Sequence, residues 1–187
     1  VLVNVDRRSW TTNGPQSNLY GLEPNFGCCT ANFHQGWPKF AASLWMAMSE
    51  GGLAAVAYSP SEVDTTVKGV RVRVSERTEY PFDEAISIAV QPDKAIAFPL
   101  LLRVPEWAGQ ASIRVNGKAE RDVRAGSFHR IERLWKAGDR VELRFPMQVR
   151  VVDGYNGGAV VERGPLVYSL KVREDWRKIA EHGPAAA

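Results

Sequence analysis

"VKGVRVRVSERTEY", which runs from Val67 to Tyr80, is the stretch that most clearly indicates the fold. Within it Val70, Val72 and Val74 alternate with polar residues. Successive side chains of a β-strand point to opposite faces of its sheet, so this alternation is typical of a strand with one buried face. The stretch therefore predicts a half-buried strand in a sheet with two unlike faces.

Further strand-like runs follow this one at short intervals. They are "AISIAVQ", "AFPLLLRVP", "ASIRVNGKAE", "SFHRIERLW", "DRVELRFPMQVRVV" and "GGAVVERGPLVYSLKV". Turn-forming pairs such as Pro92-Asp93 and Asn116-Gly117 separate them, and Asn-Gly favours a type I′ hairpin turn. Many short strands with this spacing predict a mainly β fold, an antiparallel β-sandwich or jelly roll.

The run 37–52, "WPKFAASLWMAMSEGG", has a different periodicity. Its apolar residues Phe40, Leu44, Ala47 and Met48 fall on one face of a helix. A proline suits the first turn of this helix, and the two closing glycines mark its end. We therefore predict a helix across the run.

The change of periodicity divides the chain of 187 residues. We expect residues 1–52 to be the helical end of one domain, and residues 53–187 to be a β-sandwich domain with a C-terminal tail. Val1 begins within a strand-like run, "VLVNVD", so we expect the chain to be part of a longer protein.

The charge pattern argues against two classes of partner. The chain has 24 basic and 21 acidic residues, a net charge of +3, and the signs alternate instead of forming a basic block. Nucleic-acid binding needs a clustered basic face, so we expect no such partner. No apolar run approaches the roughly 20 residues that span a bilayer, and the N-terminus does not resemble a signal peptide, so we expect no membrane partner.

The only two cysteines, Cys28 and Cys29, are adjacent in "NFGCCTANFHQGWPKF". Adjacent cysteines pair only with strain, and no third cysteine is present for an ordinary disulfide. Free thiols, a strained vicinal disulfide and metal ligation remain. The spacing alone does not choose between two inert buried thiols and thiolate chemistry, although a loop ahead of a helix start favours the thiolate.

Neighbouring polar residues are candidates with simpler explanations. Asn32 suits a local cap before it suits a contact with a substrate hydroxyl, and His34 suits a structural role before a ligand or acid–base role. Glycoside hydrolysis usually requires carboxylates, but no spacing singles out Glu23, Glu50 or Glu62.

Tryptophans are a further possibility, because sugars stack on aromatic rings. For Trp37 and Trp45 we expect core packing instead. The complete set is Trp10, Trp37, Trp45, Trp107, Trp135 and Trp176.

Two stretches carry a family resemblance. "GLEPNFGCCTANFHQGWPKF", followed by a β domain that contains "AVVERGPLVYSL", resembles the C-terminal portion of glycoside hydrolase family 127 (formerly DUF1680), which contains β-L-arabinofuranosidases. The resemblance covers roughly Leu19 to Leu170. It implies an (α/α)6 barrel catalytic domain followed by β-sandwich domains, so residues 1–52 would be the end of the barrel.

The resemblance also implies a zinc ion bound by one glutamate and three cysteines, two of them adjacent. It places the nucleophile on Cys28 and a zinc ligand on Cys29, with both sulfurs on one ion. The reaction would retain anomeric configuration through a thioglycosyl intermediate. The remaining zinc ligands and the acid/base glutamate are expected upstream of Val1.

The motif departs from characterised members at two places. These commonly read Cys-Cys-Pro-Pro-Asn with an arginine three residues later, whereas this chain reads Cys-Cys-Thr-Ala-Asn with Gln35 at the arginine position. We take Asn32, His34 and Gln35 as candidate contacts to an oligosaccharide substrate. A non-catalytic carbohydrate-binding or scaffolding β-sandwich, or an inactive relative, are the alternative functions.

Overall fold

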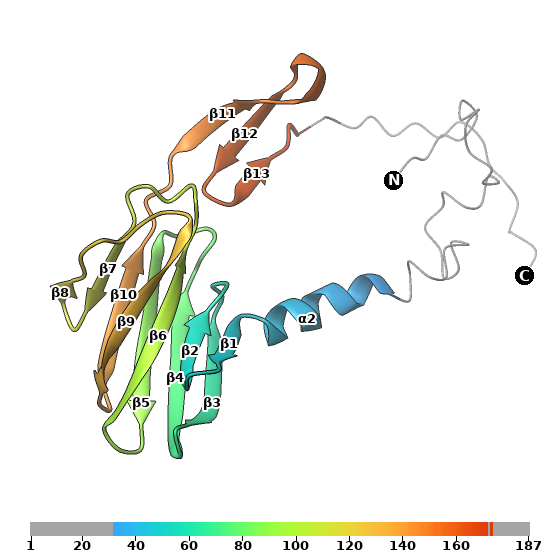
Figure 1. Cartoon of the computed structure of the whole chain (residues 1–187). Helices are drawn as coiled ribbons and strands as arrows, with labels where there is room; N and C mark the ends of the chain where they lie inside the picture. The colour runs from blue at the N-terminus through green and yellow to red at the C-terminus, as the bar shows by residue number, and fades with distance from the viewer. Residues whose placement is uncertain (1–31, 172, 174–187) are drawn as a thin grey trace, which may run out of the picture.

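The computed structural model describes residues 32–171 and 173, and β-strands dominate this part of the chain (Figure 1). One sheet has the strand order β1 (Trp45–Met48), β2 (Gly52–Ala55), β6 (Ile96–Val104), β9 (Ser127–Trp135). A second has the order β3 (Ser61–Val67), β4 (Val70–Thr78), β5 (Ala85–Pro92), β10 (Asp139–Arg144), β7 (Ser112–Val115), β8 (Lys118–Ala119). A third has the order β11 (Val149–Asp153), β12 (Ala159–Arg163), β13 (Leu166–Tyr168).

The hydrophobic core lies between the first two sheets. It joins Phe98 and Trp135 of the four-stranded sheet to Val72, Ile88 and Val141 of the six-stranded sheet, all of them fully buried. Strand neighbours in the described part of the chain are antiparallel except β2 and β6, which are parallel. The predicted mainly β fold with antiparallel sheets is confirmed.

Local sequence accounts for much of this architecture. The side chains of Val70, Val72 and Val74 are buried while their neighbours in β4 are exposed or half-buried, as the alternation predicts. Asn116 and Gly117, between β7 and β8, both have positive φ values, 50° and 79°. Two positive φ values in succession are the signature of a type I′ turn, so this prediction is also confirmed.

The predicted helix across residues 37–52 is wrong in its second half. Helix α2 (Gly36–Ala42) follows a 3₁₀ turn, η2 (Phe33–Gln35), and strand β1 begins shortly after it ends. Leu44 is buried, and its carbonyl oxygen accepts a hydrogen bond from the backbone N–H of Val56 at 2.9 Å. This burial and the pairing of β1 with β2 outweigh the local helical periodicity.

The two glycines that we expected to end the helix instead lie in a β-hairpin, with Gly51 in the turn between β1 and β2 and Gly52 as the first residue of β2. Gly51 has a φ of 81°, which favours glycine. A Cβ atom at Gly52 would overlap the carbonyl oxygen of Pro99, because β2 lies directly against β6 there. The absence of a side chain at Gly52 therefore allows β2 and β6 to pack closely.

The predictions for the two tryptophans of this region have different outcomes. Trp45 packs against the core and donates a hydrogen bond from Nε1 to Ser61 Oγ at 3.1 Å, as core packing requires. Trp37 is 75% exposed, so its predicted core packing is wrong. Helix α2 projects away from the sandwich beside β1 and buries none of its residues against the described part of the chain (Figure 1). In that part, no helix is long and apolar enough to cross a membrane.

Candidate functional site

The cysteine motif lies only partly within the described residues. Cys28 and Cys29 fall outside them, while Asn32, His34 and Gln35 lie at the start of η2 and α2. These three side chains are exposed. Gln35 Nε2 donates a hydrogen bond to Asn32 Oδ1 at 2.8 Å, so two of the three candidate substrate contacts lie side by side.

The zinc prediction depends on the same undescribed segment. Within residues 32–171 and 173, no group of three His, Cys, Asp or Glu side chains is placed to hold a metal ion. Thiolates are strong zinc ligands, so the chemistry of Cys28 and Cys29 fits the ion. Their geometry is not part of the structure.

Two of the carboxylates near the motif in sequence are held in surface ion pairs. Glu50 Oε1 lies 2.6 Å from Arg130 Nη1, and this guanidinium lowers the pKa of Glu50. Glu62 Oε1 lies 3.2 Å from Arg73 Nε. The Glu62 pair joins the neighbouring strands β3 and β4, whereas the Glu50 pair joins the β1–β2 turn to β9. Both pairs have the ordinary form of structural salt bridges.

Glu76 is the unusual carboxylate of the β domain. It lies on β4, on the same face as the buried valines, and is only 3% exposed. Ser61 Oγ lies 3.5 Å from its Oε2, whereas its Oε1 is buried and has no hydrogen-bond partner in the described part of the chain. Burial raises the pKa of Glu76 to about 7, against smaller opposing effects of hydrogen bonds from Ser59, Ser61 and Trp45.

This carboxyl group should make stability depend on pH. Its pKa is about 7 in the folded protein against 4.5 for the ordinary group, so the folded state binds more protons between these values. The stabilisation from the protonated form is fully present below pH 4.5 and is lost as the pH rises through 7. We expect a loss of about 3 kcal/mol in the free energy of unfolding over that interval, at roughly 1.4 kcal/mol per pKa unit.

Urea unfolding at several pH values tests this prediction. Glu76→Gln should flatten the decline between pH 5 and 8, whereas Glu62→Gln, on the exposed face of the neighbouring strand β3, should leave it unchanged. Parallel pH curves for the wild type and Glu76→Gln would contradict the assignment.

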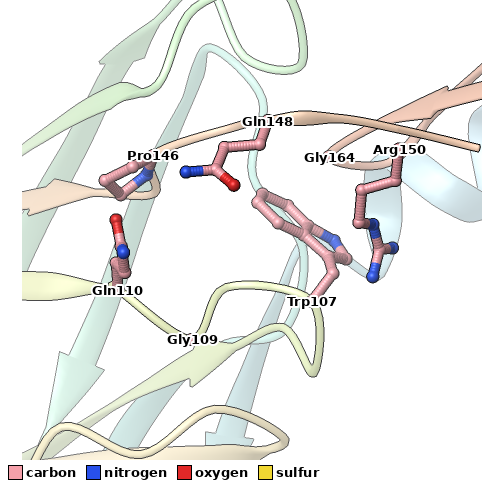
Figure 2. A pocket seen from close by; sticks show the side chains of 7 residues that line it. All are labelled: Trp107, Gly109, Gln110, Pro146, Gln148, Arg150 and Gly164. Atoms are coloured by element: carbon pink, nitrogen blue, oxygen red, sulfur yellow. The ribbon is translucent and has the colours of Figure 1, made fainter.

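A concave site in the described part of the chain lies between the sandwich and the third sheet (Figure 2). Its volume is about 170 Å³. Three segments line it: the β6–β7 connection with Trp107, Gly109 and Gln110; the β10–β11 connection and β11 with Pro146, Gln148 and Arg150; and the β12–β13 turn with Gly164. We call it the Trp107 pocket.

Packing fixes the indole of this pocket. The Trp107 ring meets Phe145 edge-on, with centroids 6.1 Å apart and an interplanar angle of 85°, and Phe145 is fully buried. On another side, a Cβ atom at Gly164 would lie 2.6 Å from Met147 Sδ and 3.3 Å from Trp107 Cη2. The β12–β13 turn therefore packs closely against the Trp107 ring and the Met147 side chain.

Sequence reasoning did not find the Trp107 pocket. Trp107 was only one of several tryptophans, and Gln110, Gln148 and Arg150 carry no motif. Gly164 lies in the stretch "AVVERGPLVYSL", which indicated the family but no binding site. The lining residues come from three segments that lie apart in the sequence, and only the order of the strands brings these segments together.

Comparisons with known proteins identify the family. The family model "Beta-L-arabinofuranosidase, GH127 middle domain" matches residues 52–147. No curated protein matches the chain.

Three solved structures resemble this one. A GH127 β-L-arabinofuranosidase from Geobacillus stearothermophilus T6 has 29% identity and a TM-score of 0.68, over 75% of this chain and 23% of that one. A structure described as a glycoside hydrolase has 26% identity and a TM-score of 0.73, over 88% and 28% of the two chains. A GH127 β-arabinofuranosidase has 26% identity and a TM-score of 0.67, over 75% and 25%.

The chain thus spans about a quarter of the length of these proteins. The family model covers half of the chain, and strands β2 to β10 with the core between them lie within the match. The chain therefore belongs to the β-L-arabinofuranosidase family GH127, and its residues 52–147 correspond to the middle domain of that family.

Proposed function

We propose that this chain is part of a retaining glycoside hydrolase that acts on β-L-arabinofuranosides or related plant-glycan sugars. The observation that carries the proposal is the match of residues 52–147 to the GH127 middle domain. The adjacent cysteines that precede this domain in the sequence support it, because thiolates are strong nucleophiles.

Cys28 is the proposed nucleophile. Its thiolate attacks the anomeric carbon, the glycosidic C–O bond breaks, and a carboxylic acid outside this chain protonates the departing oxygen. The product is a thioglycosyl bond on the Cys28 sulfur. Water, deprotonated by the same carboxylate, then attacks the anomeric carbon from the opposite side and releases the thiolate. Two inversions restore the original configuration.

Cys29 is the proposed zinc ligand, and Cys28 shares the ion. A bound zinc ion keeps a coordinating thiol deprotonated at neutral pH. The other ligands of the ion are proposed to lie in sequence upstream of Val1. Cys28 and Cys29, being adjacent, would then hold the two sulfurs in a fixed mutual geometry.

The exposed amide pair is the proposed substrate contact of the described residues. Gln35 and Asn32 already share a hydrogen bond, and both side chains are exposed. A primary amide offers both donors and an acceptor, which suits sugar hydroxyl groups. His34 is exposed beside them and is the third proposed contact.

Hydrolysis of a chromogenic β-L-arabinofuranoside tests the proposal. The assay uses a chain extended upstream of Val1, since this chain spans only a quarter of the related structures. We expect release of the chromophore, with the anomeric configuration of the sugar retained. Proton NMR of the first sugar product formed measures this configuration. Inactivity on β-L-arabinofuranosides and on other L-sugars and acidic sugars would instead favour an inactive relative.

A further inference from the structure

We propose that the Trp107 pocket binds one neutral sugar residue of a glycan chain. The assignment rests on the pocket's own geometry, and only the choice of arabinose as the first probe rests on the proposed function. Three features of the pocket carry it: a fixed aromatic ring, two glutamine amides with no hydrogen-bond partner in the described part of the chain, and a volume that suits one small ligand.

The fixed ring provides a stacking surface. Trp107 is half-buried, and its edge-on contact with the buried Phe145 holds the indole in one orientation. Figure 2 shows this ring in the middle of the lining side chains, between the amide of Gln148 and the guanidinium of Arg150. An aromatic face that is already held in place costs little conformational entropy when an apolar sugar face stacks on it.

The polar side chains around the ring suit hydroxyl groups. Gln110 and Gln148 are exposed, and neither side-chain amide makes a hydrogen bond to another group in the described part of the chain. Each amide offers both donors and an acceptor, and a sugar hydroxyl is also both donor and acceptor. The two amides come from different connections, so they can reach different hydroxyls of one ring.

The charge in the pocket is largely compensated. Arg150 Nη2 donates a hydrogen bond to Glu162 Oε2 at 3.2 Å, on the neighbouring strand β12. This ion pair orients the guanidinium and offsets its charge, while other N–H groups of Arg150 remain to bond a ligand. A neutral ligand therefore suits the pocket better than an anion.

The size of the pocket limits the ligand. Its volume of about 170 Å³ is below the roughly 300–1,000 Å³ of sites for drug-sized molecules. Gly164 lies on one side, where an added Cβ atom would crowd the side chains of Met147 and Trp107. One sugar residue fits such a space, with the rest of the glycan extending into solvent.

A second hollow provides a contrast. It has a volume of about 420 Å³, lies over strands β4, β5, β10 and β7, and contains Arg77, Arg114 and Arg144 but no aromatic residue. Neutral sugars have no stacking surface there. Arg114→Ala is therefore a matched control outside the Trp107 pocket.

Binding of simple glycosides to the chain of 187 residues tests the proposal by NMR. The probes are methyl β-L-arabinofuranoside, a short arabinan oligosaccharide and methyl glucuronide. We expect saturable shifts of the Trp107 indole N–H and of the Gln110 and Gln148 amides with the neutral probes. The expected dissociation constant is on the order of 1 mM, because one sugar contacts few groups.

Substitutions then assign the site. Gln110→Ala and Gln148→Ala, at exposed positions, should each weaken neutral-sugar binding about fivefold by removing hydrogen bonds, and Trp107→Ala should abolish it. Arg114→Ala and Trp37→Ala should leave it unchanged. If Trp107→Ala destabilises the fold, the binding affinities of the two glutamine variants test the site without it.

Three results would overturn the proposal: no shift at Trp107 with either neutral probe, equal binding by both glutamine variants and wild type, or preference for the glucuronide. Cys28→Ser should bind the neutral probes as the wild type does. Failure of this sugar site would therefore leave the hydrolase proposal standing, and an inactive longer chain would leave the sugar site standing.

Discussion

Cys28→Ser should reduce hydrolysis of a chromogenic β-L-arabinofuranoside at least about 1,000-fold in the chain extended upstream of Val1. A serine hydroxyl is not deprotonated at neutral pH, so the variant would lack the proposed nucleophile. The loss should fall mainly on kcat, because the substitution leaves the contacts that bind the substrate in place. Steady-state kinetics with wild type and variant measure it.

Two companion measurements separate a nucleophile from a structural cysteine. Mass spectrometry of wild type quenched during turnover should find one sugar added to the peptide that contains Cys28, and none added to this peptide in Cys28→Ser. Cys29→Ser should lower the zinc content as well as the rate, since Cys29 is the proposed ligand. Undiminished hydrolysis by Cys28→Ser would end the assignment.

The strands were predictable because their determinants are local. The alternation across residues 70–74 requires only that one face of a strand be buried, and Asn116-Gly117 carries its turn geometry in its own backbone preferences. The burial of Glu76 was not predictable in the same way. It occupies the next inward position of the same strand, where an apolar residue is the ordinary choice.

The segment around residue 45 shows where local pattern fails. Leu44, Ala47 and Met48 have helical spacing, yet the chain there pairs as β1 with β2, and the parallel partner of β2 is β6, far along the sequence. Pairing between distant segments leaves no mark in a short window. The close contact between Gly52 and Pro99 is equally invisible until the two strands are adjacent.

The two candidate sites differ in how far the sequence alone could predict them, because one is local and the other is assembled by the fold. The cysteine pair is a local motif, so the sequence alone indicated it, although Cys28 and Cys29 lie outside the described residues. The Trp107 pocket is assembled from connections that lie far apart in the sequence, and only the strand order brings Gln110 near Gln148. Sequence reasoning therefore finds chemistry that one segment carries, and misses chemistry that the fold assembles.

Trp135→Ala should have the largest effect on stability of the substitutions considered, a loss of about 3–5 kcal/mol in the free energy of unfolding. Trp135 is the largest fully buried side chain among the residues that the structure describes, and its ring lies against Phe98 at a centroid distance of 5.8 Å. Its Nε1 donates a hydrogen bond to the Phe98 carbonyl oxygen at 2.9 Å. Alanine would leave a large cavity between the sheets and a buried carbonyl without this donor.

Trp37→Ala is the matched control, because it removes the same atoms at a position that is 75% exposed. It should change the free energy of unfolding by less than about 0.5 kcal/mol, whereas Trp135→Phe should cost about 1–3 kcal/mol through loss of the hydrogen bond to Phe98. Denaturant unfolding of the three variants gives the comparison, provided that the slopes agree. Equal losses for Trp135→Ala and Trp37→Ala would show that the packing of the two sheets does not limit the stability of the domain. A large loss confined to Trp135 would place the stability of the domain in the core between its two main sheets.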